Sequence, residues 1–213
     1  MKKLAVLASL VVALALPAAA QSVRFPPIPP DKMDAKTKQF ADDLKNSPRA
    51  GNITNAPFKV YARSPEFASY AIKMSDYLRW GTGMDGRLSE LAILIAARNW
   101  TSDYIWHAHY PIAVKGGLDP SVGADIAAGK RPTKLKPDEA IIYDYLVETY
   151  RDKNVSDATF NAAVKQFGEK GVTDIIGLAG YYGITAMSLI AAKADTAPGN
   201  EPKLVRMAQV FPK

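Results

Sequence analysis

The stretch RLSELAILIAARNWTSDYIWHAHYPIAVKGGL, residues 87–118, predicts two consecutive helices and decides the fold class. Its first half carries a long apolar run after Glu90 and predicts a helix over about 87–99. Its second half predicts a helix over about 101–115, closed by the glycine pair at 116–117. Neither half alternates apolar and polar residues as a half-buried strand does. The stretch therefore indicates a helix pair with a buried face.

The remainder of the chain is helical in character on both sides of this pair. Ser64 followed by Pro65 is typical of an N-cap and a first helical position, so a helix is expected from there toward Trp80. Further helices are expected over about 34–44, 119–129, 136–151, 156–167 and 171–193. No segment shows sustained strand-like alternation. The sequence thus predicts an all-α fold, a helical bundle of seven to eight helices.

Composition excludes several kinds of chemistry. The chain has 213 residues, 27 Lys and Arg, 21 Asp and Glu, two His and no Cys. Without Cys there is no disulfide, thiolate nucleophile or Cys-ligated zinc, and the two His of one chain cannot supply a zinc site of three imidazoles. The basic excess is mild and dispersed, unlike the clustered Lys and Arg of nucleic-acid-binding proteins. No nucleic-acid partner, metal or cofactor is therefore expected.

The N-terminus has the three parts of a secretory signal peptide. A basic start at 1–3 precedes an uncharged apolar run over 4–16, and small residues follow at 18–20. The apolar run is short for a membrane span, so cleavage near Ala20 is favoured over an uncleaved anchor. We expect an exported protein, periplasmic or secreted, with no membrane contact beyond the cleaved segment.

The expected organisation of the chain has four parts. They are a signal peptide at 1–20, an N-terminal arm and helix at 21–54, one helical domain at 55–195 and a C-terminal tail at 196–213. The arm begins with the Pro-rich residues 22–30, which favour extended backbone.

The last expected helix contains 18 uncharged residues, 175–192, which is the lower limit for a membrane span. Three glycines interrupt the run, and Asp174 and Lys193 lie directly at its ends. A helix that is apolar all round also occurs in a protein core or an oligomer interface. We therefore favour a buried helix over a membrane span.

Glu90 and the two histidines are the candidate chemical groups. His107 and His109 point about 200° apart on a regular helix, so they cannot bind one metal ion side by side. His109 shares its face with Ser102 and Trp106, whereas His107 lies toward the opposite face. Spacing alone favours a hydrogen-bonded core histidine at His109 over a functional one.

Glu90 also has two interpretations. Arg87 lies one helical turn before it and could form a surface ion pair with it. A buried Glu90 would instead have a raised pKa unless a cation or a hydrogen-bond donor offset the burial. Spacing within this helix does not decide between the two.

Several segments resemble the carboxymuconolactone decarboxylase family, which also contains the alkylhydroperoxidase-D-like proteins. The resemblance covers about 55–193 and is most specific in RLSELAIL (87–94), YIWHAH (104–109) and AVKGGL (113–118). The later segments VTDI (172–175) and GYY (180–182) are also similar to the family. The resemblance implies an all-α fold that assembles as a homotrimer or homohexamer through its long helices.

The resemblance also implies which residues form the site. The family's Glu and His correspond to Glu90 and His109, and the two cysteines of the peroxidase branch correspond to Ser102 and Ile105. A dithiol peroxidase cycle requires both thiols, so this activity is not expected here. The chain is closer to the decarboxylase branch, a lyase that keeps the Glu–His pair without thiol redox.

The resulting hypothesis is acid–base chemistry on a small lactone or organic acid. His109 would deliver a proton, Glu90 would orient its ring, and Ser102 would donate to a lactone or carboxylate oxygen. The expected substrate-binding residues are Tyr104, Trp106 and His107.

Two alternatives remain open from the sequence. One is a non-catalytic oligomeric binding protein that keeps the family fold. The other is a thiol-independent peroxidase or metal-assisted enzyme that combines Glu90, His107 and His109 across subunits.

Overall fold

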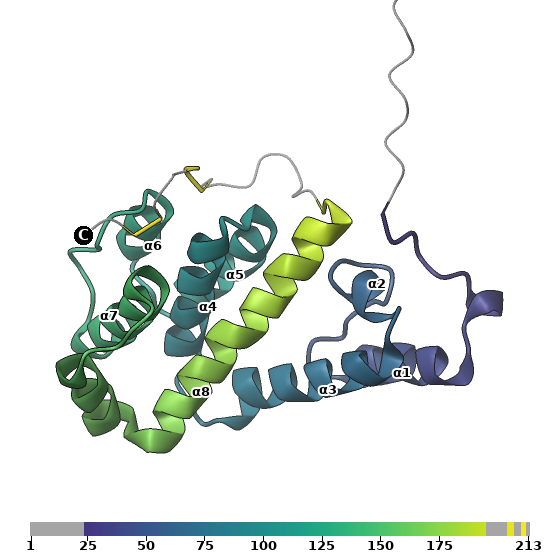
Figure 1. Ribbon diagram of the computed structural model, residues 1–213, viewed down its shortest axis with the longest axis horizontal. Coiled ribbons are helices and arrows are strands. Elements are labelled where there is room, and N and C mark those ends of the chain that lie inside the picture. The colour runs from purple at the N-terminus through teal and green to yellow at the C-terminus, as the bar shows by residue number, and fades with distance from the viewer. Residues whose placement is uncertain (1–23, 195–203, 207–209, 212–213) are drawn as a thin grey trace, which may run out of the picture.

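The computed structural model describes residues 24–194, 204–206 and 210–211, which form a helical bundle (Figure 1). The described residues contain eight α-helices, a 3-10 turn and a π-helical turn, with no strand among them. This confirms the predicted all-α fold of seven to eight helices. The expected signal peptide, residues 1–20, lies outside the described residues, as does most of the expected tail.

The helices follow one another with short connections. They are α1 Ala35–Asn46, α2 Phe58–Tyr61, α3 Pro65–Asp76, α4 Gly86–Trp100, α5 Asp103–Lys115, α6 Pro120–Ala127, α7 Pro137–Asp152 and α8 Asp157–Ala192. The 3-10 turn is Pro30–Lys32 and the π-helical turn is Tyr77–Gly81.

Side-chain caps explain where several helices begin. Asp34, Asp85 and Ser156 each accept a hydrogen bond from a backbone N–H in the first turn, at 2.7, 2.8 and 3.3 Å. Such bonds satisfy donors that the helix itself leaves free. Ser64 precedes α3 as expected but makes no side-chain cap bond, so the proline at the first position marks this start.

Three local features differ from the expected helices. The short helix α2 was not expected, and α3 continues into the π-helical turn Tyr77–Gly81. The helices expected at 156–167 and 171–193 are joined in α8, which bends where Gly168 has non-helical backbone angles, φ 68° and ψ 168°. A positive φ favours glycine, so the bend falls at a residue that tolerates it.

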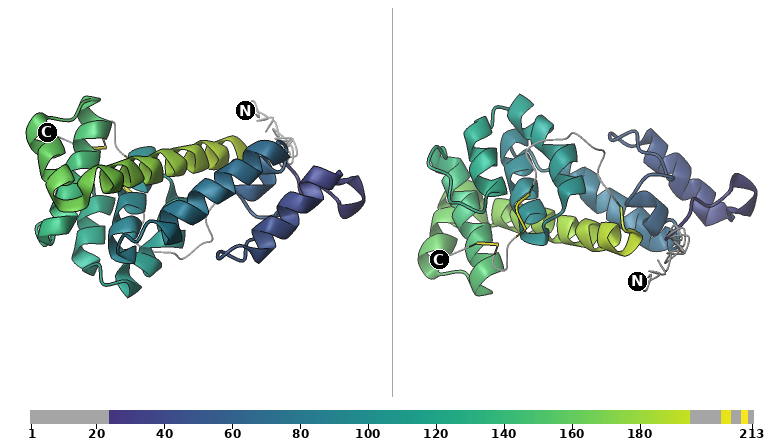
Figure 2. Two further views of the ribbon diagram at one scale, coloured as in Figure 1. Left: turned by 90° about the horizontal axis from the view of Figure 1, so that it is seen from below. Right: turned by 90° about the horizontal axis from the view of Figure 1, so that it is seen from above.

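α4 is the centre of the bundle and packs against α5, α7 and α8. Every residue from Leu91 to Ala97 is fully buried, which explains the uninterrupted apolar run. The long C-terminal part of α8 passes between α4 and α5 on one side and α3 on the other (Figure 1). Figure 2 shows α1 at one end of the molecule and α6 and α7 at the opposite end.

Within the described part of the chain, α8 is the one helix long and apolar enough to cross a membrane. Its most apolar window has a mean hydropathy of 1.6, and 56% of that window is buried in the protein. The buried face includes Ile175, Leu178 and Ala186. A core helix has these same properties, so the packing supports the buried-helix interpretation.

Candidate active site

α4 and α5 bring Glu90 and His109 together. The Nδ1 atom of His109 lies 2.6 Å from Oε2 of Glu90, and both side chains are buried. The sequence left open a surface pair between Glu90 and Arg87, and the structure does not contain it. Arg87 instead contacts Asp138 and Glu139 at the start of α7.

A second cation contacts Glu90 from the π-helical turn. Arg79 donates from Nη2 to Oε1 of Glu90 at 3.2 Å, so both carboxylate oxygens have a partner. Burial acts to raise the pKa of Glu90, but the hydrogen bond and charge of His109, together with Arg79, outweigh it and hold the pKa below its ordinary value. Glu90 is therefore ionised at neutral pH.

The ionised carboxylate determines which imidazole nitrogen is available. A carboxylate only accepts hydrogen bonds, so Nδ1 of His109 carries the hydrogen that it donates to Glu90. The Nε2 atom is then the nitrogen left to act on a ligand. Tyr182 packs edge-on against the imidazole, with ring centroids 4.9 Å apart and planes at 85°. Burial raises the pKa of Tyr182, which keeps its phenol neutral beside the pair.

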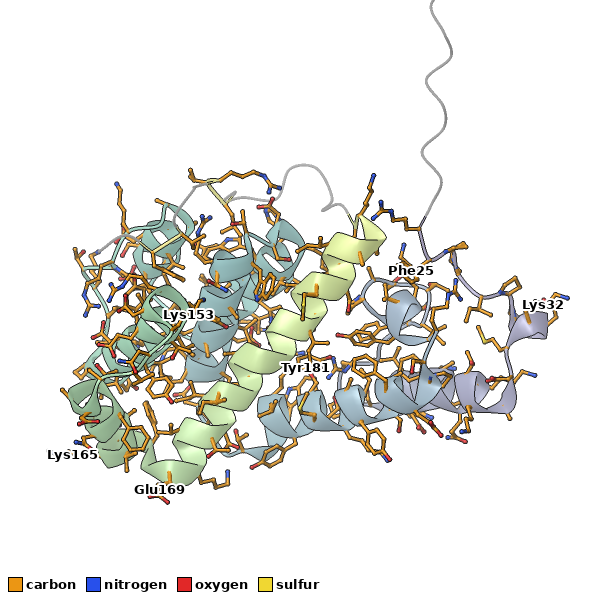
Figure 3. All side chains as sticks on the ribbon, viewed as in Figure 1. Phe25, Lys32, Lys153, Lys165, Glu169 and Tyr181 are labelled. Carbon is orange, nitrogen blue, oxygen red and sulfur yellow. The ribbon has the colours of Figure 1, made fainter. Side chains whose placement is uncertain are left out.

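A cavity of about 210 Å³ lies beside His109. It is lined by the loop before α2, by α2 itself, and by parts of the π-helical turn, α5 and α8. Figure 3 marks one lining residue, Tyr181, on α8 where this helix passes α3. The lining residues are Arg49, Gly51, Ala56, Pro57, Phe58, Arg79, Tyr104, Ile105, Ala108, His109, Tyr181, Tyr182 and Thr185.

The structure brings only some of the expected site residues to this cavity. Tyr104 lines it and donates its hydroxyl hydrogen to the carbonyl oxygen of Ala56 at 2.8 Å. Ile105, at the second cysteine position of the family resemblance, also lines it. An apolar side chain there closes the wall without offering any redox chemistry.

Three other expected residues do not line the cavity, which corrects the expected pocket. Ser102 is the N-cap of α5 and lines a separate polar hollow with Asp103 and Lys193. Trp106 is completely buried in the core. Its ring stacks on Tyr110, with centroids 5.8 Å apart. His107 is half-buried on the same helix and is not among the lining residues.

Sequence reasoning missed several residues of the cavity. Arg49 lies in the loop between α1 and α2, and Arg79 lies in the turn after α3, outside the helix that carries Glu90. A buried Glu90 was expected to need a cation or a hydrogen-bond donor, and the sequence offered Arg87 only as a surface partner. Arg87, one turn away in the sequence, was the nearer choice, whereas the structure uses Arg79.

Comparisons with known proteins give no matching family model, no matching curated protein and no matching solved structure. Among the described residues, no group of three or more His, Asp or Glu side chains is arranged to hold a metal ion. The geometry defines a buried carboxylate–imidazole pair beside a small cavity lined by aromatic, small apolar and arginine side chains. Such a pair can move a proton to or from a bound ligand.

Proposed function

We propose that this protein is a carboxymuconolactone decarboxylase-like lyase that acts on a small lactone or organic acid. The observation that carries the proposal is the 2.6 Å contact between His109 and Glu90 beside a cavity of about 210 Å³. The sequence resemblance names the same two residues as the polar centre of the family. The absence of Cys excludes thiol redox and thiolate nucleophiles, and acid–base chemistry by the Glu90–His109 pair does not need them.

The proposed reaction begins when the bond between the substrate's carboxylate carbon and its neighbour breaks. Carbon dioxide leaves, and the electron pair of the broken bond moves into the conjugated lactone. The protonated imidazole of His109 then gives its Nε2 proton to the carbon that carries the charge. Glu90, held ionised by Arg79 and His109, stabilises the imidazolium before transfer and fixes the ring orientation. Water restores the proton afterwards.

The test is turnover on a panel of lactone acids and small organic acids by the variants His109→Gln and Glu90→Gln. We expect His109→Gln to lower kcat by about 10²–10⁴-fold, the usual contribution of a general acid. Glu148→Gln is the matched control, because Glu148 bonds to Ser156 and Thr159 away from the cavity. Full turnover by a folded His109→Gln variant would disprove the proposal.

A non-catalytic oligomer is the second candidate, and an apolar groove supports the self-association that it shares with the proposed lyase. α4, α7 and α8 form a groove of about 460 Å³, with Trp100, Tyr145, Ile176 and Met187 among its lining residues. Exposed apolar surface of this kind marks association sites. We propose that a second copy of the chain covers it in a homotrimer or homohexamer. Sedimentation equilibrium tests this, with Met187→Glu expected to lower the mass to that of a monomer.

Export completes the proposal and rests on the sequence of residues 1–20. N-terminal sequencing of the protein from a periplasmic or culture fraction should begin at Gln21. A chain that begins at Met1 in the cytoplasmic fraction would contradict it.

A further inference from the structure

Two arginine side chains line the cavity beside the Glu90–His109 pair, and the proposed proton transfer uses neither of them as an acid or a base. Arg49 comes from the loop between α1 and α2, before the region that resembles the family. Arg79 comes from the π-helical turn. Both side chains are largely buried, with 10% and 14% of their surface exposed.

Arg49 is held firmly at one edge of its guanidinium group. Its Nε and Nη2 atoms donate to Oδ1 of Asp76 at 3.2 and 2.6 Å, and Nη2 also donates to the hydroxyl of Ser75 at 2.8 Å. These bonds fix the plane of the group. The Nη1 atom makes no hydrogen bond to any described residue, so this end of a pre-oriented guanidinium is left for a ligand.

Arg79 has an unused donor as well. Its Nη2 atom donates to Glu90, but its Nε atom is buried and has no hydrogen-bond partner among the described residues. That atom has almost no accessible surface, so it does not face the cavity. The Nη1 atom of Arg79 also makes no hydrogen bond to a described residue, and it is the donor left for a ligand oxygen.

Both guanidinium groups also contact one aromatic side chain. Both lie over the ring of Trp80, with their central carbons 5.5 Å (Arg49) and 4.4 Å (Arg79) from its centroid. Each guanidinium already has one carboxylate partner, Asp76 for Arg49 and Glu90 for Arg79, so a ligand in the cavity can use only the donors outside these pairs. A carboxylate suits this position because its planar pair of oxygens matches guanidinium donors.

We propose that Arg49 and Arg79 form a carboxylate-recognition site, and that the ligand of this cavity is a small carboxylic acid with an unsaturated or aromatic body. The body would lie against the apolar and aromatic lining, which includes Phe58, Tyr104 and Tyr182. The inference deepens the proposed function, on which it rests for the identity of the site. It makes Arg49, outside the family-like region, a specificity-determining residue.

The experiment compares binding of benzoate with binding of benzamide, its uncharged analogue, by isothermal titration calorimetry on the mature protein. We expect benzoate to bind at least about tenfold more tightly, because only its carboxylate engages both arginines. Arg49→Gln and Arg79→Gln should each weaken benzoate binding by about tenfold to a hundredfold, the effect of losing one charge-assisted hydrogen bond. Benzamide binding should change little.

Two controls separate recognition from folding and from net charge. Arg63→Gln removes an exposed positive charge that bonds to the carbonyl of Pro26 and does not line the cavity, so benzoate affinity should stay the same. Asp76→Asn releases Arg49 from its ion pair but keeps the guanidinium, so benzoate should still be preferred to benzamide. Circular dichroism verifies that each variant is folded.

Failure of this inference is distinguishable from failure of the proposed function. Equal affinity for benzoate and benzamide, no benzoate binding, or unchanged binding by folded Arg49→Gln and Arg79→Gln would overturn the carboxylate site. None of these results depends on turnover. His109→Gln should retain the preference for benzoate even though it loses turnover, because the imidazole moves the proton and the arginines hold the anion.

Discussion

Two buried ionic clusters begin on the same helix, α4, at Arg87 and at Glu90, one turn apart. Arg87 joins α4 to the start of α7 through Asp138, at 2.6 Å, and through Glu139. Glu139 also accepts from the backbone N–H of Lys136 at 2.7 Å, which caps α7. Glu90 joins α4 to α5 through His109 and to the π-helical turn through Arg79.

The difference between the clusters lies in what is left unbonded. The charges of the Arg87 cluster contact one another and the end of a helix, so the cluster connects two elements. The Glu90 cluster faces a cavity and leaves Nε2 of His109 and Nη1 of Arg79 without a hydrogen bond to any described residue. Buried polar groups that lack partners beside a cavity are candidates for ligand contact. Unused donors that face a cavity therefore distinguish the cluster proposed to bind a ligand from the one that joins two helices.

The largest expected effect on stability is from Arg87→Met. Glu139 is 1% exposed, and removing its cation leaves a buried carboxylate unpaired. We expect the free energy of unfolding to fall by about 3–5 kcal/mol, measured by urea denaturation. Arg131→Met, which breaks the exposed pair with Asp144, should cost only about 0–1 kcal/mol. An equal fall in the free energy of unfolding of the two variants would mean that the buried Arg87–Glu139 pair is no more stabilising than the exposed Arg131–Asp144 pair.

A smaller and pH-dependent effect is expected from Glu90→Gln. At neutral pH the variant loses charged hydrogen bonds to His109 and Arg79, at a cost of about 1.5–3 kcal/mol. The pKa of Glu90 is lower in the folded state than its ordinary value of 4.5, so its ionised form stabilises the fold above that value. This contribution disappears as the pH falls through the folded-state pKa.

Urea denaturation of wild type and Glu90→Gln from pH 7 downward measures this contribution. The gap between the two proteins should be constant near neutrality and narrow below pH 4.5. A gap that widens on acidification would show that Glu90 is protonated in the folded protein. It would then resemble a buried acid rather than the partner of a cation.

The smallest expected effect is from Ser102→Ala. Ser102 accepts from the backbone N–H of Ile105 at 3.5 Å, a long bond, so its loss should cost about 0.5–1 kcal/mol of stability. Because Ser102 lines a different hollow, turnover and benzoate affinity should not change. A tenfold loss of turnover would place Ser102 in contact with substrate and would extend the site beyond the Glu90 cluster.

The positions of most helices follow from local signals that the sequence contains. Asp34, Asp85 and Ser156 cap helices as their residue types and positions predict. The same local reasoning placed Ser102 incorrectly beside His109. Ser102 is the N-cap, with φ −92° and ψ 93°, so the angular spacing of a regular helix does not apply to its side chain.

The candidate site was predictable only in part, because helix spacing does not fix the direction of each side chain. Glu90 and His109 emerged from the sequence through their resemblance to a known pattern, and the structure places them in contact. Trp106 lies on roughly the same side of α5 as His109. Its ring nevertheless stacks on Tyr110 and is buried in the core, away from the cavity. Side-chain direction within one face depends on the neighbouring helices.

The sequence by itself determined the helical class, most helix starts and the exclusion of thiol chemistry, because these depend on residues close together in the chain or on composition alone. Only the tertiary structure decided that Arg79 rather than Arg87 is the cation of Glu90, and that Arg49 reaches the same cavity. The pairing of a buried charge depends on which elements the core brings together. That choice is made by packing over the whole molecule, beyond the range of any local pattern.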